Sequence, residues 1–160
     1  MKRIFDLILG VVILLLFIAI MLLISISIRL SSKGSVLYWS NRVGKNNKIF
    51  KMPKFRTMLI DTPSVASHLL TNPDAYLSSI GGCLRRYSLD ELPQLFSILK
   101  GDMSFVGPRP ALNTQDDLIF LRTQKGVDKL VPGITGWAQV NGRDELSLED
   151  KAAFDADYID

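Results

Sequence analysis

Two residue types that carry much protein chemistry are nearly absent from this 160-residue chain, which has one cysteine and one histidine. Cys83 alone cannot form an internal disulfide, which is typical of a protein from a reducing compartment. With only His68 beside it, the chain lacks the four ligands of a conventional His/Cys zinc site. A Ser-His-Asp triad would have to use His68. Because no nucleophile motif lies near His68, we interpret this residue as a loop histidine.

Charge and proline are both absent from the 22 residues that run from Leu7 to Ile28. A helix of that length covers about 33 Å, close to the hydrocarbon thickness of a bilayer. The run exceeds the apolar region of a signal peptide and no small-x-small cleavage site follows it, which argues against a cleaved leader. We therefore expect a retained membrane-inserted helix over residues 1–30, followed by one domain over residues 31–160.

Two topologies remain open for this helix. Lys2 and Arg3 precede it and a basic block follows it, and basic flanks favour the cytoplasmic side of a membrane. Two cytoplasmic flanks would require a re-entrant hairpin, whereas the length fits a straight span equally well. No proline supplies a sharp bend, and back-bonding by Ser25 and Ser27 would bend the helix only mildly.

Acidic residues are absent from residues 29–60, which carry a net charge of +8, whereas residues 61–160 carry −6. Anionic lipid headgroups attract such a basic block by roughly 1 kcal/mol per Lys or Arg near the surface. Nucleic acid could use the same charge, but the block lacks an aromatic ladder or a known reading motif. Membrane lipid is therefore the favoured partner, and nucleic acid is not expected.

The pattern after the apolar run predicts an α+β domain, mostly helical, with interfacial amphipathic helices. Strands are expected at 36–39 and 49–58 around a turn at 41–47, followed by a loop at 61–80. Helices are expected at 92–99 with a stop at Lys100-Gly101, at 111–130 with Leu118, Ile119, Leu121 and Leu130 inward, and at 146–159. A tight loop at 132–136 is expected to precede a strand at 137–140.

The segment Ser88–Leu95 carries the sharpest signal for chemistry. As local structure it predicts a helix start, with Ser88 and Glu91 as a capping box and Asp90 near the positive helix terminus. A functional interpretation is compatible with that start. A carboxylate held at a helix N-terminus is oriented and kept acidic, so Asp90 could be a nucleophile or a metal ligand. Asp90 and Glu91 together could also share a Mg²⁺ ion.

Three basic residues are candidates to hold phosphate near these carboxylates. Arg109 stands between two prolines, so its backbone has little freedom and its guanidinium fork matches two phosphate oxygens. Arg85 lies just upstream of the acidic pair. Lys54 follows Pro53 in the basic block, where contact of Lys54-Phe55-Arg56 with lipid headgroups is the alternative. The three cations could hold a diphosphate, and the two carboxylates could hold a metal ion. Together they resemble a phosphoryl-transfer site.

Six blocks in order resemble the bacterial sugar transferase family, the monotopic polyprenyl-phosphate phosphoglycosyl transferases. The resemblance runs from about Lys2 to the end of the chain. The blocks are the apolar helix after Arg3-Ile4-Phe5-Asp6, then Arg42-Val43-Gly44, Phe50–Met58, Ser88–Leu95, Lys100–Pro110 and Pro132–Arg143.

This resemblance implies transfer of a sugar 1-phosphate from a nucleotide diphosphate sugar, usually a UDP-sugar, to undecaprenyl phosphate. It implies a ping-pong route on the cytoplasmic face of the bacterial inner membrane, initiating glycan assembly. Asp90 would form a phosphosugar ester, Glu91 would help hold Mg²⁺, Arg85 and Arg109 would bind phosphate, and Lys54 would lie near the membrane interface. The nucleotide-sugar pocket is expected at Gly133, Thr135, Gln139, Asn141 and Arg143. Homodimer formation is left open.

Two features depart from the family pattern. Family members with a re-entrant helix break it at a Ser-Pro pair, where this chain has Ile18-Ala19. Related chains run on past Tyr158, so we expect that this sequence is C-terminally truncated. The alternative function is a catalytically silent membrane-anchored module that binds anionic lipid or a partner in glycan assembly. UMP release from UDP-sugars would separate the two functions, and the sugar itself is not readable from the sequence.

Overall fold

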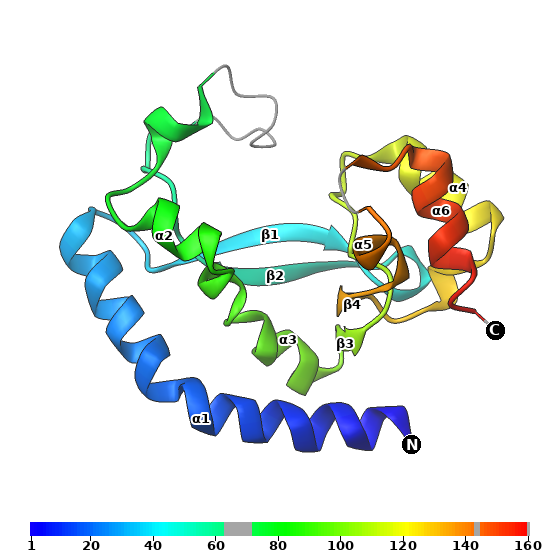
Figure 1. Cartoon of the computed structure of the whole chain (residues 1–160), viewed down its shortest axis with the longest axis horizontal. Helices are drawn as coiled ribbons and strands as arrows, with labels where there is room; N and C mark the ends of the chain where they lie inside the picture. The colour runs from blue at the N-terminus through cyan, green and yellow to red at the C-terminus, as the bar shows by residue number, and fades with distance from the viewer. Residues whose placement is uncertain (63–71, 143–144, 160) are drawn as a thin grey trace.

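The computed structural model describes residues 1–62, 72–142 and 145–159, and about half of the chain is helical. A long helix, α1 (Lys2–Ser31), runs along one side of a body built from short helices and two small sheets (Figure 1). Strands β1 (Leu37–Val43) and β2 (Ile49–Phe55) pair antiparallel, and β3 (Ser104–Val106) and β4 (Gly133–Thr135) pair parallel. The other α-helices are α2 (Gly81–Arg86), α3 (Gln94–Lys100), α4 (Asp116–Gln124), α5 (Trp137–Val140) and α6 (Leu148–Ala156). The 3-10 helices are η1 (Lys45–Asn47), η3 (Pro73–Tyr76), η4 (Leu89–Glu91) and η5 (Val127–Lys129).

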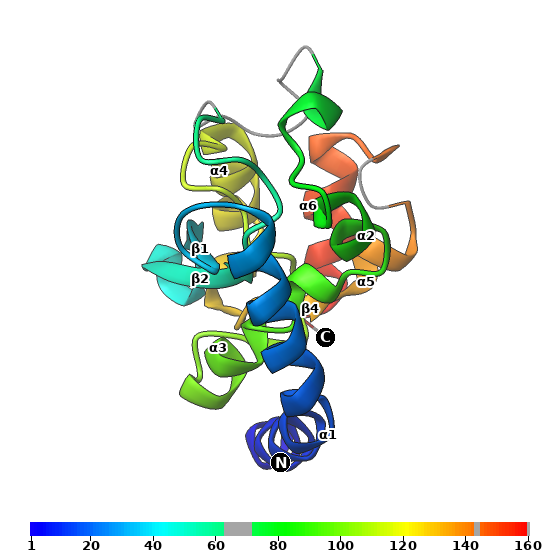
Figure 2. The ribbon, with the colours of Figure 1, turned by 90° about the vertical axis from the view of Figure 1, so that its left-hand side faces the viewer.

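Helix α1 is continuous in its hydrogen bonding but bends near its middle into two arms, with α3 in the angle between them (Figures 1 and 2). The bend occurs without a proline, so the sharp bend that a re-entrant helix requires has another cause. The predicted serine back-bonds are present in the second arm. Ser25 Oγ donates to the Met21 carbonyl at 2.7 Å, and Ser27 Oγ donates to the Leu23 carbonyl at 2.9 Å.

Both arms of α1 are attached to the same body. At the start of the first arm, three side chains form hydrogen bonds with residues around α3 and β3. These bonds join Lys2 Nζ to the Val106 carbonyl at 2.7 Å, Arg3 NH2 to the Leu99 carbonyl at 2.7 Å, and Ser104 Oγ to Asp6 Oδ2 at 2.9 Å. In the second arm, Met21, Ile24 and Ile28 are buried in one cluster with Phe55 and Leu84. Packing at both ends accounts for the bend, because a straight helix could not reach both contacts.

The rest of α1 exposes a nearly continuous apolar surface. Large apolar side chains such as Leu16, Leu23 and Leu30 are 65–83% exposed. Within the described part of the chain, α1 is the one helix long and apolar enough to cross a membrane, judged by length and composition. Such a surface is stable only in contact with lipid or a partner.

The first sheet agrees in part with the sequence pattern. Strand β2 lies within the predicted 49–58 segment, but β1 continues to Val43 through most of the predicted turn, which is reduced to η1. The extension has a partner that is distant in sequence. The Val43 N–H donates to the Ala111 carbonyl at 3.0 Å, and Arg42 forms an isolated bridge with Leu112.

Predictions for the C-terminal half are confirmed for two helices, confirmed in part for a third, and wrong for residues 132–140. Helix α3 ends at Gly101, whose φ of 101° is a conformation that favours glycine, and α6 fits the predicted 146–159 helix. Helix α4 covers only part of 111–130: Leu118 is buried, Ile119 and Leu121 are half-buried, and Leu130 lies beyond the following η5. The predicted loop at 132–136 contains β4, and the predicted strand at 137–140 is α5.

Candidate functional site

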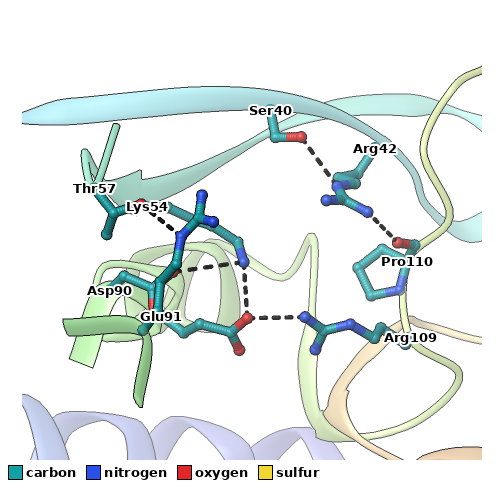
Figure 3. A network of polar contacts seen from close by, with 9 residues as sticks. Ser40, Arg42, Lys54, Thr57, Asp90, Glu91, Arg109 and Pro110 are labelled. Carbon is teal, nitrogen blue, oxygen red and sulfur yellow. Dashed lines mark hydrogen bonds and ion pairs between the residues drawn. The ribbon is translucent and has the colours of Figure 1, made fainter. Parts of the chain in front are cut away.

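The structure brings together five of the residues that the sequence nominates. Lys54 projects from β2, Asp90 and Glu91 stand on η4, Arg85 lies in the last turn of α2, and Arg109 lies in the loop after β3 (Figure 3). The contacts of β2 with η4, and of η4 with α2, hold the carboxylates against the strand. All five side chains are buried or half-buried.

Glu91 is fixed by two cations that contact the same carboxylate oxygen. Lys54 Nζ lies 2.7 Å and Arg109 NH2 lies 2.8 Å from Glu91 Oε1. Burial alone would raise the pKa of Glu91, but Lys54 and Arg109 outweigh it and lower the pKa to about 2. Glu91 is therefore ionised throughout the physiological pH range.

Asp90 has a different environment although it is the adjacent residue. Its Oδ2 lies 4.0 Å from Lys54 Nζ, so one ammonium faces both carboxylates. Burial raises the pKa of Asp90 above its ordinary value, and the Glu91 charge adds to this, while Lys54 and Arg85 oppose it. The side chain combines the higher basicity of a buried carboxylate with cations close enough to keep an incoming anion in place.

The predicted capping box is wrong. Ser88 adopts a left-handed conformation with φ of 54°, makes no side-chain cap, and is followed by η4 rather than by an α-helix. The Glu91 N–H donates instead to the Ser88 backbone carbonyl at 3.1 Å. The Glu91 carboxylate cannot turn back to Ser88 because Lys54 and Arg109 hold it.

Two further residues belong to the site and were not nominated. Thr57 Oγ1 accepts a hydrogen bond from Arg85 Nε at 2.9 Å, which fixes the arginine side chain near enough to Asp90 for its charge to lower the pKa of that carboxyl. Arg42 on β1 lies near Arg109 and Glu91, and its burial followed by the Arg109 charge lowers its pKa to about 10. Arg42 lies in one of the six sequence blocks that resemble the family, and this was the signal that could have identified it as a site residue. Four basic side chains thus surround two acidic ones, giving a net positive site.

The interpretation of Lys54-Phe55-Arg56 as a lipid headgroup contact is wrong. Lys54 faces the carboxylates, and Arg56 is buried, where its NH2 group donates to the carbonyl and Oγ of Ser32 at 3.1 and 2.9 Å. Arg42 also points inward. The exposed members of the basic block are Arg29, Lys33, Lys45, Lys48 and Lys51.

The expected nucleotide-sugar residues lie beside the loop that carries Arg109. The Gly133 N–H donates to the Pro108 carbonyl at 2.9 Å, and a Cβ on Gly133 would lie 2.2 Å from the Gly107 nitrogen, so this glycine permits close backbone packing. Thr135 lines a cavity of about 280 Å³ with residues that include Trp137 and Tyr158. Gly133 is thus explained by packing, and Thr135 by access to a cavity.

Three other predicted residues are less informative. Both polar atoms of the Gln139 side-chain amide are buried and form no hydrogen bond within the described structure. Asn141 Nδ2 donates to the Trp137 carbonyl at 2.9 Å, which is a local contact in an exposed position. Arg143 and His68 lie outside the described residues.

A magnesium ion fits this site only with ligands from a substrate. Within residues 1–62, 72–142 and 145–159, no group of three or more His, Cys, Asp or Glu side chains could hold a metal. Asp90 and Glu91 supply two carboxylates that converge on one ammonium. Mg²⁺ is commonly held by one or two carboxylates together with phosphate oxygens and water, so the pair suits an ion that arrives with a phosphate substrate.

The arrangement as a whole is suited to attack on a phosphate group. Positive charge lowers the cost of bringing a polyanion into a partly buried site and stabilises charge that develops during transfer. Asp90 places a buried carboxylate, a group that can act as a nucleophile, at its centre.

Comparison with known proteins connects this geometry with a family. Residues 1–160 match the family described as bacterial sugar transferase. The exopolysaccharide production protein ExoY of Rhizobium meliloti is 38% identical over 99% of this chain and 76% of its own length. Two longer relatives match over about a third of their lengths. The undecaprenyl-phosphate glucose phosphotransferase of Komagataeibacter xylinus is 41% identical over 99% of this chain and 32% of its own. The UDP-glucose:undecaprenyl-phosphate glucose-1-phosphate transferase of Escherichia coli is 38% identical over 99% and 36%.

Proposed function

This chain belongs to the bacterial sugar transferase family and is a phosphoglycosyl transferase, and we propose that it transfers a sugar 1-phosphate from a UDP-sugar to undecaprenyl phosphate. The observation that carries the proposal is the convergence of Lys54 and Arg109 on the Asp90-Glu91 pair. The names of the relatives support the acceptor, and the positive charge of the site suits a diphosphate donor.

The proposed reaction has two steps that share Asp90. In the first, a carboxylate oxygen of Asp90 attacks the sugar-bearing phosphorus of the UDP-sugar, and the bond from that phosphorus to the bridging oxygen breaks. UMP leaves with the electron pair of that bond. In the second, a phosphate oxygen of undecaprenyl phosphate attacks the same phosphorus and displaces Asp90. The carboxylate is regenerated, and the product is an undecaprenyl diphosphate sugar.

The surrounding cations have separate duties in this proposal. Arg109 and Arg85 hold phosphate oxygens and neutralise the charge that develops as UMP leaves. Lys54 keeps Glu91 in place through an ion pair, and its ammonium attracts the negative charge of the phosphate toward Asp90. Each of these groups is already hydrogen-bonded or ion-paired, so little reorganisation is required when the donor binds.

Asp90 and Glu91 would hold Mg²⁺ together with the donor diphosphate. The ion would supply Lewis-acid stabilisation of the phosphate oxygens. Replacement of Glu91 by glutamine removes one of the two carboxylates and should leave weak activity with a raised Mg²⁺ requirement. A Glu91→Gln variant with an unchanged Mg²⁺ requirement would remove this residue from the metal site.

The nucleotide-sugar side of the pocket is proposed to involve the 132–143 block. Thr135 has access to a cavity beside Val106, and the Gly107 N–H donates to the Thr135 carbonyl at 2.8 Å. This contact lies two residues before Arg109. A donor whose diphosphate meets Arg109 could therefore extend toward Thr135.

We propose a re-entrant membrane helix and a domain on the cytoplasmic face of the bacterial inner membrane. The bonds of Lys2, Arg3 and Asp6 attach the start of α1 to the body that also packs against its second arm. A helix attached to one body at both ends cannot carry its N-terminus to the far side of a bilayer. The exposed basic residues after α1 favour the same face through anionic headgroups.

The direct test is UMP release by purified protein in membranes or detergent, with undecaprenyl phosphate and a panel of UDP-sugars. Asp90→Asn should abolish UMP release, because an amide cannot form the phosphosugar ester. Asp116→Asn, in the exposed first turn of α4, is a matched control that should retain activity. An active Asp90→Asn enzyme would overturn the assignment. No UMP release with any nucleotide sugar would instead support a catalytically silent membrane module.

A further inference from the structure

A buried ion pair lies behind the site, away from the groups that would meet substrate. Arg122 on α4 contacts Asp155 on α6, with Arg122 Nε 2.9 Å from Asp155 Oδ2 and the NH2 group on the same oxygen. The Asp155 side chain is 0% exposed and that of Arg122 is 12% exposed. A charged pair so well shielded from water carries a large desolvation cost.

The same guanidinium reaches the loop that carries the phosphate-binding arginine. Arg122 NH1 donates to the Arg109 carbonyl at 2.8 Å. Arg42 NH1, from β1, donates to the next carbonyl, that of Pro110, at 3.1 Å, as Figure 3 shows. Two arginines from separate elements therefore hold consecutive peptide groups at Arg109-Pro110.

The ion pair is not the only buried feature of the two packed helices. Leu118 on α4 and Ala152 on α6 are also buried, so α4 and α6 carry buried apolar side chains as well. A well-packed apolar pair in place of Arg122 and Asp155 could be equally stable. What an apolar pair could not do is present a donor to the Arg109 carbonyl.

We infer that Asp155 and Arg122 are positioning residues, which fix the backbone of Arg109 so that its guanidinium faces Glu91 and the donor phosphate. Asp155 orients the planar fork of Arg122 through two of its nitrogens, and the third nitrogen holds Arg109. A lysine cannot reproduce this geometry because one ammonium lacks the fixed fork. The inference rests on the proposed function of Arg109.

The decisive experiment is a double-mutant cycle on UMP release. Arg122→Lys and Asp155→Asn should each lower kcat/KM by about ten- to a hundredfold, since a small displacement of a catalytic group has effects of this size. In an Arg109→Ala background the same substitutions should lower kcat/KM by no more than about twofold, because the guanidinium that they position is absent. Equal losses in both backgrounds would overturn the inference.

Ser147→Ala is the matched control for damage to α6. Ser147 caps this helix by accepting the Asp150 N–H at 3.0 Å, and it has no contact with Arg122 or Arg109 among the described hydrogen bonds. It should lower the melting temperature and leave kcat/KM of the folded enzyme unchanged. If Ser147→Ala reduces kcat/KM as much as Asp155→Asn does, the ion pair acts through stability alone.

Hydrogen exchange gives a readout that does not depend on catalysis. Asp155→Asn should speed amide exchange in residues 107–112, and Ser147→Ala should leave that segment unchanged. A loop that stays protected in Asp155→Asn would contradict the inference even if the enzyme proves inactive toward UDP-sugars. Faster loop exchange without any UMP release would sustain the positioning role and refute the proposed function.

Discussion

Asp90 and Glu91 are adjacent in the chain, yet their surroundings move their pKa values in opposite directions. Burial raises the pKa of Asp90, whereas Lys54 and Arg109 overcome burial at Glu91 and lower its pKa to about 2. Two carboxylates with separated pKa values are suited to separate roles. Glu91 has the features of a fixed anionic support, and Asp90 those of a more basic nucleophile.

The ionisation of Asp90 gives a pH prediction. In the proposed reaction Asp90 must be ionised to attack. Because its pKa is raised, the acid limb of kcat/KM should lie above the ordinary aspartate value of 3.8. Lys54 lowers the pKa of Asp90, so Lys54→Met should move that limb to higher pH. Lys51→Met, an exposed lysine on the same strand, should leave it in place. A limb that stays fixed in Lys54→Met would contradict the ionic role of Lys54.

Arg109 gives a prediction about phosphate binding. Loss of a charge-assisted bidentate contact should remove roughly 2–4 kcal/mol of transition-state stabilisation. Arg109→Ala should therefore slow turnover by roughly 30- to 900-fold, and Arg109→Lys should not restore it fully. Steady-state UMP release measures both, with the exposed Arg86→Ala as the control. If Arg109→Ala turns over like the wild type, Arg109 is only a turn residue.

At the scale of elements, local sequence predicted the helices and strands whose residues decide their own conformation. Glycine 101 marked the end of α3, and the pattern of β2 was clear. Prediction from local sequence failed where contact with a segment far away in the chain determines the conformation. Residues 137–140 fit a strand as well as a helix, but β3 pairs with Gly133–Thr135 instead. The bend of α1 has the same origin, since it depends on contacts at both arms.

The bend of α1 leads to a topology prediction. In a Cys83→Ser background, a Lys2→Cys variant should be protected from a membrane-impermeant thiol reagent in intact cells and labelled after the cells are opened. Arg3 and Asp6 still attach the first arm in this variant. Lys125→Cys, which follows α4, is the control for the cytoplasmic side. Labelling of Lys2→Cys from outside would mean a straight span.

At the scale of the whole molecule, the site depends on segments that are far apart in the chain. The residue pattern singled out Asp90, Glu91, Lys54, Arg85 and Arg109, the family resemblance implied their roles, and the structure brings these five together. The sequence could not show that Lys54 contacts Glu91 rather than lipid, because that depends on how β2 packs against η4. Arg42 was missed for the same reason, since its role depends on the separate loop at Pro110.

The most direct test of the account is a half-reaction with the UDP-sugar and Mg²⁺ and without undecaprenyl phosphate. Trypsin releases the peptide Tyr87–Lys100, whose only carboxylate side chains are Asp90 and Glu91. The account predicts a stoichiometric burst of UMP, a sugar-phosphate mass on the intact protein, and a hydroxylamine-trapped hydroxamate at Asp90 in that peptide. UMP release that occurs only when both substrates are present, with no adduct on Asp90, would contradict it.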